Sequence, residues 1–290
     1  MDRRSEKKTM NRRSLTVAAL AGLALGALAF GTFAVRAEEP AAPQNTMEEP
    51  VAPRQSWSFA GPFGKFDQAQ LQRGFEVYQK VCSACHSLKL VAFRDLGEPG
   101  GPEFSEAQIK TLAASYKVKD GPNDSGDMFE RPGRPSDHFP PPFANEQAAA
   151  AALGTAPPDM SDLAKARSIP RPFPLFIFDL FTQYQEQGPD YIVGIMNGYT
   201  DPNDPKYNAY FPGHKIAMPK PLADGLVPYT DGTPQTVDQY AKDVAAFLYW
   251  AAEPKLDERK ELGFQVILFL IVFAGLLYFT KKKIWSSVPH

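Results

Sequence analysis

The sequence VCSACH at residues 81–86 decides how the rest of this chain is interpreted, because it contains the only two cysteines among 290 residues. Two residues separate Cys82 from Cys85, and His86 follows directly. Thiols at this spacing can each form a thioether with one vinyl group of a haem, and the adjacent histidine then becomes the proximal iron ligand. The motif therefore predicts one covalently attached haem c.

Other kinds of site also use two cysteines. A thioredoxin-like redox pair needs no histidine here and usually lies at a strand-to-helix junction, whereas helix-like sequence precedes Cys82. A structural zinc site requires four ligands, and the sequence has no second cysteine pair to complete one. A chance match within a disulfide-bonded domain is the remaining alternative.

The N-terminal sequence has the pattern of an export signal. Six basic side chains lie within residues 1–13, and an apolar run covers residues 15–35. This order predicts a signal peptide at residues 1–37, cleaved after Ala37. The alternative is an uncleaved anchor, because the apolar run is long. A Pro/Ala/Glu-rich, mobile leader is expected at residues 38–56.

A second apolar run lies near the C-terminus. Residues 262–280 carry no charge, and as a helix they would be about 28 Å long, enough to cross the hydrocarbon core of a bilayer. Three lysines follow, so residues 281–290 are expected to be a cytoplasmic tail. Residues 57–261 would then form a periplasmic domain anchored in the inner membrane by a single pass. A buried core helix is the alternative for the apolar run.

The charge of the chain is unevenly distributed. The formal net charge is −2, but residues 38–261 hold 21 basic and 31 acidic residues, a net charge of −10. This sign and an exported location exclude nucleic acid as a partner, and they favour association with a basic protein. Eight of the acidic residues lie between Asp95 and Glu130. The alternative is that the acidity serves solubility alone.

Two helices are expected to enclose the domain. Residues 66–80 have apolar side chains at helical spacing, Asp67 can cap them, and Gly74 permits close packing. A second helix should start after Thr236, whose spacing to Gln239 is that of a capping box, and should run through Trp250. We expect these helices to pack against each other, as the first and last helices of small c-type cytochromes do. The proline-rich sequence between them has few periodic runs, so the predicted fold class is mainly α with extensive loops around the haem.

The sixth iron ligand is expected to be Met218. It lies in the sequence HKIAMPKPL, where Pro219 and Pro221 restrict the backbone and allow a thioether to be presented with little loss of entropy. Met160 follows a similar Pro-Pro-Asp sequence and is an alternative, whereas Met196 fits a core position better. The remaining candidates are Met47, Met128, His138 and His214.

Several longer blocks of sequence resemble the cytochrome c1 family: RPGRPSDHFPPPFANEQAA, APPDMSDLAKAR, YNAYFPGHKIAMPKPL and DGTPQTVDQYAKDVAAFLYWAAEP. The resemblance extends from about Trp57 to Trp285. It implies that His86 and Met218 are the axial ligands of the haem iron. It also implies that Arg167 and Tyr191 match the arginine and tyrosine that lie near a haem propionate in this family.

The resemblance implies a function as well. Cytochrome c1 is the haem subunit of the cytochrome bc1 complex (ubiquinol–cytochrome c oxidoreductase) in respiratory or photosynthetic electron transport. The expected partners are cytochrome b, which would hold the quinol site, the Rieske iron–sulfur protein and a basic soluble or membrane-bound cytochrome c, in a dimeric complex. One alternative is an independent membrane-anchored cytochrome that serves a terminal oxidase. Another is a haem enzyme such as a peroxidase, which would need an open sixth position.

This chain departs from the family pattern in two segments. The sequence IPRPFPLFIFDLFTQYQEQGPD between Arg167 and Tyr191 is longer and more aromatic than the link expected there. Residues 98–127 are also expanded and acidic. Because both cysteines are assigned to the haem, the additional disulfide of some bacterial relatives cannot form.

Overall fold

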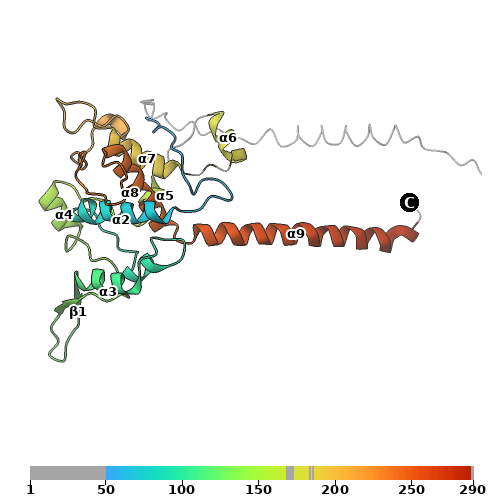
Figure 1. The fold of residues 1–290 in the computed structure, drawn as a ribbon, viewed down its shortest axis with the longest axis horizontal. Coiled ribbons are helices and arrows are strands. Elements are labelled where there is room, and N and C mark those ends of the chain that lie inside the picture. The colour runs from blue at the N-terminus through green and yellow to red at the C-terminus, as the bar shows by residue number, and fades with distance from the viewer. Residues whose placement is uncertain (1–49, 168–172, 183, 185, 289–290) are drawn as a thin grey trace, which may run out of the picture. The chain divides into compact units, whose positions relative to one another are not determined.

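The computed structural model describes residues 50–167, 173–182, 184 and 186–288 (Figure 1). The predicted signal peptide at residues 1–37, the first part of the predicted leader and the last two residues of the predicted tail lie outside the described residues. The described part is mainly helical. Its α-helices are α2 (Gln68–Lys80), α3 (Glu106–Ala114), α4 (Glu146–Leu153), α5 (Leu163–Ala166), α6 (Leu175–Thr182), α7 (Gln187–Asn197), α8 (Val237–Ala252) and α9 (Leu256–Ile284). The two strands of the described part are β1 (Lys117–Asp120) and β2 (Phe129–Pro132). Short 3-10 helices are η1 (Cys82–Ala84), η2 (Phe93–Gly97), η3 (Pro212–His214) and η4 (Trp285–Ser287).

Helix α2 forms where the sequence predicts a helix. The side chain of Asp67 caps it by accepting a 2.7 Å hydrogen bond from the backbone N–H of Gln70. Leu71, Phe75 and Tyr78 are buried along one face, at the spacing that the sequence shows. The last turn leads directly to the cysteine motif, so the packing of this helix positions the motif.

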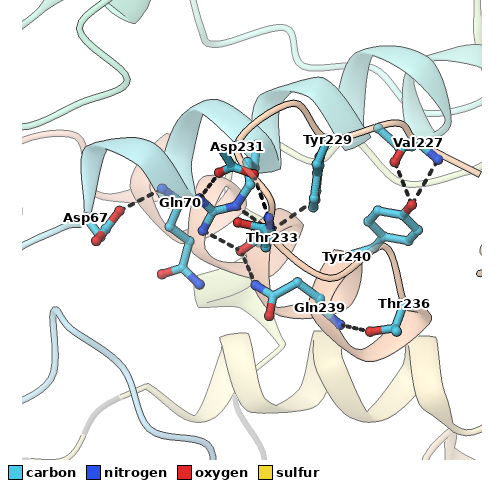
Figure 2. Close-up of polar contacts among 11 residues, drawn as sticks. Asp67, Gln70, Val227, Tyr229, Asp231, Thr233, Thr236, Gln239 and Tyr240 are labelled. Atoms are coloured by element: carbon cyan, nitrogen blue, oxygen red, sulfur yellow. Dashed lines mark hydrogen bonds and ion pairs between the residues drawn. The ribbon is translucent and has the colours of Figure 1, made fainter. Parts of the chain in front are cut away.

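Helix α8 also confirms its prediction, with one difference at its start. Thr236 accepts a 3.3 Å hydrogen bond from the backbone N–H of Gln239, which is the N-cap that was expected (Figure 2). The side-chain amide of Gln239, however, donates a 2.9 Å hydrogen bond to the carboxylate of Asp243. An acceptor one turn further along the same helix therefore competes for the side chain that the capping-box pattern would direct to the helix N-terminus.

Helices α2 and α8 pack closely at Gly74. A Cβ atom on this residue would lie 2.1 Å from the backbone oxygen of Asp243 and 2.7 Å from the Cβ of Phe247. Phe75 and Phe247 pack edge to face beside this contact, with ring centroids 5.5 Å apart. The predicted association of the two helices is therefore confirmed, and it requires a residue without a side chain at position 74.

A buried carboxylate strengthens this helix pair. Asp243 is fully buried and accepts hydrogen bonds from Arg73 Nε at 3.0 Å and from the Tyr229 hydroxyl at 3.0 Å. Arg73 also pairs with Asp231 at 2.8 Å. Tyr240 fixes the neighbouring loop, because its hydroxyl donates to the backbone oxygen of Val227 at 2.6 Å (Figure 2). The network thus joins α2, α8 and the loop before α8.

The segment between α2 and α8 contains more regular structure than was expected. Strands β1 and β2 form an antiparallel hairpin, with Lys117 opposite Pro132, and helices α3 to α7 interrupt the loops. Helix α7 is buried on several faces: Ile192, Val193, Ile195 and Met196 are all enclosed. These buried residues form a short continuous apolar run in the sequence, and periodicity alone does not distinguish such a run from a buried strand.

Helix α9 contains the apolar run predicted at residues 262–280 and begins earlier, at Leu256. Its apolar side chains are exposed, and within the described residues it is the helix that is long and apolar enough to cross a membrane. Its first turns are attached to the domain. Lys260 Nζ donates to the backbone oxygens of Phe59 and Gly64, and Asp257 accepts from the backbone N–H of Phe66 at 3.3 Å. It is a single membrane anchor continuous with the domain.

The contact at Gly74 leads to a prediction about stability. We expect Gly74→Ala to lower the free energy of unfolding by about 1–3 kcal/mol, because the added methyl group must push α2 away from α8. The control is Gly263→Ala in α9, where no atom lies within 4 Å of the added Cβ. Both variants of the full chain would be unfolded thermally in detergent and followed by circular dichroism. A Gly74→Ala variant as stable as the control would contradict the close approach.

Candidate haem site

The cysteine motif forms a compact turn at the end of α2. Val81 ends the helix, and residues 82–84 form the short 3-10 helix η1. The backbone N–H groups of Cys85 and His86 both donate to the backbone oxygen of Cys82, at 3.1 and 2.9 Å. The turn therefore holds both cysteines and the histidine next to one another.

The state of the cysteines argues against a redox pair. Both are free thiols rather than partners in a disulfide. Burial, together with the nearby Cys85, raises the pKa of Cys82 to about 12. Redox-active Cys-x-x-Cys pairs have the opposite property, a lowered thiol pKa. Among the described residues, moreover, no group of three or more potential metal-binding side chains lies together, which does not support a structural zinc site.

The imidazole of His86 is oriented by one hydrogen bond. Its Nδ1 lies 2.9 Å from the backbone oxygen of Pro158. A carbonyl oxygen can only accept, so Nδ1 carries the proton and Nε2 keeps the lone pair that binds a metal. Burial lowers the pKa of His86, although the hydrogen bond to Pro158 and the charge of Asp159 oppose this effect. The neutral tautomer that can bind iron is therefore the favoured one.

Asp159 fastens the segment after His86 to the Pro-Pro-Asp loop. Its carboxylate accepts hydrogen bonds from Ser87 Oγ at 2.6 Å, from the Lys89 backbone at 3.0 Å and from the Ser161 backbone at 2.9 Å. Burial alone would raise the pKa of Asp159, but these hydrogen bonds outweigh it and hold the pKa below its ordinary value. The backbone N–H of Met160 adds a 2.8 Å hydrogen bond to the oxygen of Ser87. Sequence reasoning did not assign a role to Asp159.

Met218 is half-buried and packs against the hydrophobic core. The hydroxyl of Tyr199 donates a 2.9 Å hydrogen bond to the backbone oxygen of Met218. Burial raises the pKa of Tyr199 to about 12, so this donor stays protonated at neutral pH. The tyrosine links the methionine loop to the end of α7, and no signal in the sequence singled it out.

The rest of the methionine loop is organised by Asn208, which is completely buried. Its side chain donates to the backbone oxygen of Ile195 at 2.8 Å and accepts from the backbone N–H of Tyr210 at 3.0 Å. A Cβ on Gly198 would lie 2.3 Å from the same amide oxygen. Asn208 therefore attaches the loop that leads to Met218 directly to the C-terminal end of α7.

The structure places the other candidate methionines in less suitable positions. Met160 is buried, and its backbone N–H binds the oxygen of Ser87, so it lies close to His86 in the structure. Met196 is buried within α7, as expected for a core residue. Met128 is exposed next to β2, and Met47 lies outside the described residues.

The candidate histidines are also accounted for. His138 is exposed, and its backbone pairs with Ala92. His214 has a positive φ of 56° and stacks on Tyr207, and its Nδ1 lies 3.3 Å from the backbone oxygen of Asn208. His214 is thus part of the turn that shapes the methionine loop.

Arg167 and Tyr191 lie on adjacent helices. Arg167 caps the C-terminal end of α5 and is exposed, whereas Tyr191 is half-buried in α7. A Cβ on Gly188 of α7 would lie 1.5 Å from the backbone oxygen of Ala164 of α5, so the two helices are in direct contact. The elements that carry both residues are therefore held together.

The donor set fits a haem c. It comprises two thiols that can bond to vinyl groups, a neutral imidazole with Nδ1 already occupied and a thioether on a separate, fastened loop. These are the four functional groups that covalent attachment and axial ligation require.

Comparison with known proteins agrees with this assignment. A family model described as the Cytochrome C1 family matches residues 57–288. The chain is 57% identical over 278 residues to "Cytochrome b/c1" of Bradyrhizobium diazoefficiens; this match covers 93% of the chain but only 40% of that relative's length. It is 52% identical over 244 residues to "Cytochrome c1" of Blastochloris viridis, covering 81% of the chain and 86% of the relative. The corresponding protein of Rhodospirillum rubrum is 48% identical over 261 residues, covering 82% and 88%.

The hydrogen bonds of Asp159 lead to a second prediction. We expect Asp159→Ala to lower the free energy of unfolding by about 1–3 kcal/mol, because it leaves the Ser87 and Lys89 donors without their acceptor. Asp162→Ala is the control, since that side chain is exposed in the same loop and makes no capping bond. Denaturant unfolding of the haem-loaded full chain, followed by absorption, measures the difference. Equal stability of the two variants would contradict the assigned role.

Proposed function

This chain belongs to the cytochrome C1 family, a family of haem c proteins, and we propose that it passes single electrons from a Rieske iron–sulfur protein to a cytochrome c within the cytochrome bc1 complex. The haem supplies a one-electron iron couple. The observation that carries the proposal is the turn at residues 82–86, which presents two free thiols and an oriented neutral imidazole. The protein's contribution is to hold the ligands and to place them between its partners.

We assign four residues to the haem. Cys82 and Cys85 form the two thioethers, and His86 is the proximal ligand through Nε2. Met218 is the distal ligand, supported by its half-buried position and by the hydrogen bond from Tyr199. Ligation by one histidine and one methionine gives the haem iron a higher reduction potential than ligation by two histidines, because thioether sulfur favours ferrous iron. This suits a carrier late in an electron-transport chain.

Arg167 and Tyr191 are proposed to stabilise a haem propionate. The guanidinium would neutralise the carboxylate, and the phenol would donate a hydrogen bond to it. The contact between α5 and α7 at Gly188 supports the pairing, because it fixes the two helices relative to each other.

The proposed orientation places residues 57–261 in the periplasm and residues 281–290 in the cytoplasm. Three lysines end α9, and positive charge is retained on the cytoplasmic side. The predicted signal peptide at residues 1–37 would provide export. In this arrangement the quinol site belongs to cytochrome b, which α9 would contact inside the membrane, and the complex is a dimer.

A basic cytochrome c is the proposed electron acceptor. The exported segment has a net charge of −10, and the β1–β2 hairpin with its flanking residues carries a large share of the acidic side chains between Asp95 and Glu130. Charge of this kind increases encounter rates at low salt, where the Debye length is about 30 Å at 0.01 M against about 10 Å at 0.1 M. We therefore propose this stretch as part of the docking surface.

The ligand assignment can be tested by substitution. We expect Met218→Leu to remove the sulfur-to-iron charge-transfer absorption of the oxidised protein and to lower its reduction potential, while the haem stays attached through Cys82 and Cys85. Met196→Leu, which changes a methionine buried in α7, should leave both properties unchanged. If Met218→Leu has a wild-type spectrum, another residue is the sixth ligand.

The assignment to a complex can be tested in membranes. Mild detergent extraction should yield the chain together with a cytochrome b and a Rieske protein, and ubiquinol should reduce its haem. Electron transfer onward to a basic cytochrome c should slow as ionic strength rises, because salt screens the acidic surface. Isolation without these partners, together with direct donation to a terminal oxidase, would favour the independent carrier. If the rate of electron transfer to cytochrome c did not depend on ionic strength, the proposed docking surface would be contradicted, but the assignment to the complex would not.

A further inference from the structure

Helix α6 exposes a group of aromatic side chains to solvent. It lies in the aromatic segment between Arg167 and Tyr191. Three phenylalanines, which we call the aromatic foot, are largely exposed: Phe173 (77%), Phe176 (52%) and Phe178 (59%). Leu175 beside them is also exposed. Several large apolar side chains exposed together on one short segment are costly in water and usually mark a contact surface.

The only charged residue among residues 173–182 is buried and is not part of this exposed surface. Asp179 is 7% exposed, and its carboxylate lies 3.5 Å from the guanidinium of Arg54. The same guanidinium stacks over the ring of Tyr184, 3.4 Å from its centroid. These contacts attach α6 to the domain at Asp179, while the rings of the aromatic foot stay exposed.

The segment that carries Arg54 also reaches the base of the membrane anchor. A few residues after Arg54, the backbone oxygen of Phe59 accepts a hydrogen bond from Lys260 of α9. Phe63, which is 72% exposed, packs edge to face on Phe264, with ring centroids 5.5 Å apart. One short segment therefore contacts both α6 and the first turns of α9.

The position of α6 agrees with these contacts. Figure 1 shows α6 at the end of the domain from which α9 projects. Phe264 lies at the start of the uncharged run that begins at Leu262, so its contact with Phe63 marks the level at which the chain enters the bilayer. Tryptophan and tyrosine are enriched at this level in membrane proteins, and phenylalanine and leucine form the apolar side of helices that lie in it.

We propose that the aromatic foot inserts into the boundary between headgroups and acyl chains of the bilayer, beside α9. A lipid surface is favoured over a protein partner because the segment that holds α6 also contacts the start of the uncharged run of α9, through Phe63 and Phe264. In addition, the exposed side chains of the foot include no charge that a protein partner could pair with. An exposed apolar segment of this kind is suited to binding at the membrane interface. With α9 it gives the domain a second point of attachment, which limits rotation of the haem domain about the anchor. The proposal requires α9 to cross a membrane and does not depend on the electron-transfer partners.

The test uses the haem-loaded full chain in phospholipid nanodiscs. A phospholipid with a photoreactive diazirine on the acyl chain near the headgroup would be activated, and the labelled peptides identified by mass spectrometry. We expect label on the peptide containing Phe173, Phe176 and Phe178, and on α9. The matched control is the peptide containing Met128 and Phe129, whose side chains are also exposed and apolar but lie in the hairpin. It should remain unlabelled.

A variant and a second sample make the outcome decisive. Phe173→Ser, Phe176→Ser and Phe178→Ser combined should reduce labelling of this peptide to the level of the hairpin peptide, with α9 still labelled and the haem spectrum unchanged. If the variant fails to fold, the labelling pattern of the wild-type chain alone tests the proposal. An unlabelled foot in the wild-type chain would overturn the proposal. The proposal would also be overturned if the foot were labelled in the isolated chain but not in the complex extracted with its partners. A protein, and not lipid, would then cover the foot.

Discussion

The contact between α2 and α8 at Gly74 is the constraint on which the rest of the structure depends. Because Gly74 has no side chain, α2 lies directly on the backbone of Asp243, and the carboxylate of the same residue binds Arg73. Helix α2 leads into the cysteine motif, and α8 is followed at once by the membrane anchor. One helix contact therefore fixes the position of the haem attachment site relative to the start of the span.

The proposed axial ligands lie on segments that are not part of a regular helix or sheet, yet hydrogen bonds attach both segments to the domain. The peptide oxygen of Pro158 orients His86, and Asp159 fastens the residues that follow it. Tyr199 and Asn208 attach the methionine loop to the end of α7. Hydrogen bonds of this kind keep ligands in place with little motion, which suits a carrier whose ligand set must serve both oxidation states.

Features encoded by neighbouring residues could be predicted from the sequence, and features that depend on distant contacts could not. The cap at Asp67, the cysteine motif and the apolar run of α9 are local patterns. Helix α3 was missed although Ser105 and Gln108 form a capping box that the sequence displays. Helix α7 was not predicted because its buried residues form a short continuous apolar run, which periodicity alone does not identify as a helix. The roles of Tyr199, Asn208 and Asp159 arise from tertiary hydrogen bonds, for which a single sequence gives no signal.

The central claim is that one imidazole and one thioether, presented from two separately fastened loops, bind the haem iron on opposite faces. X-ray absorption at the iron edge of the oxidised and reduced full-length protein tests this most directly, because it reports the atoms bound to iron without altering any residue. The account predicts a single sulfur neighbour, with all other neighbours being nitrogen, in both oxidation states. Absence of the sulfur neighbour, or its loss on a change of oxidation state, would contradict the account.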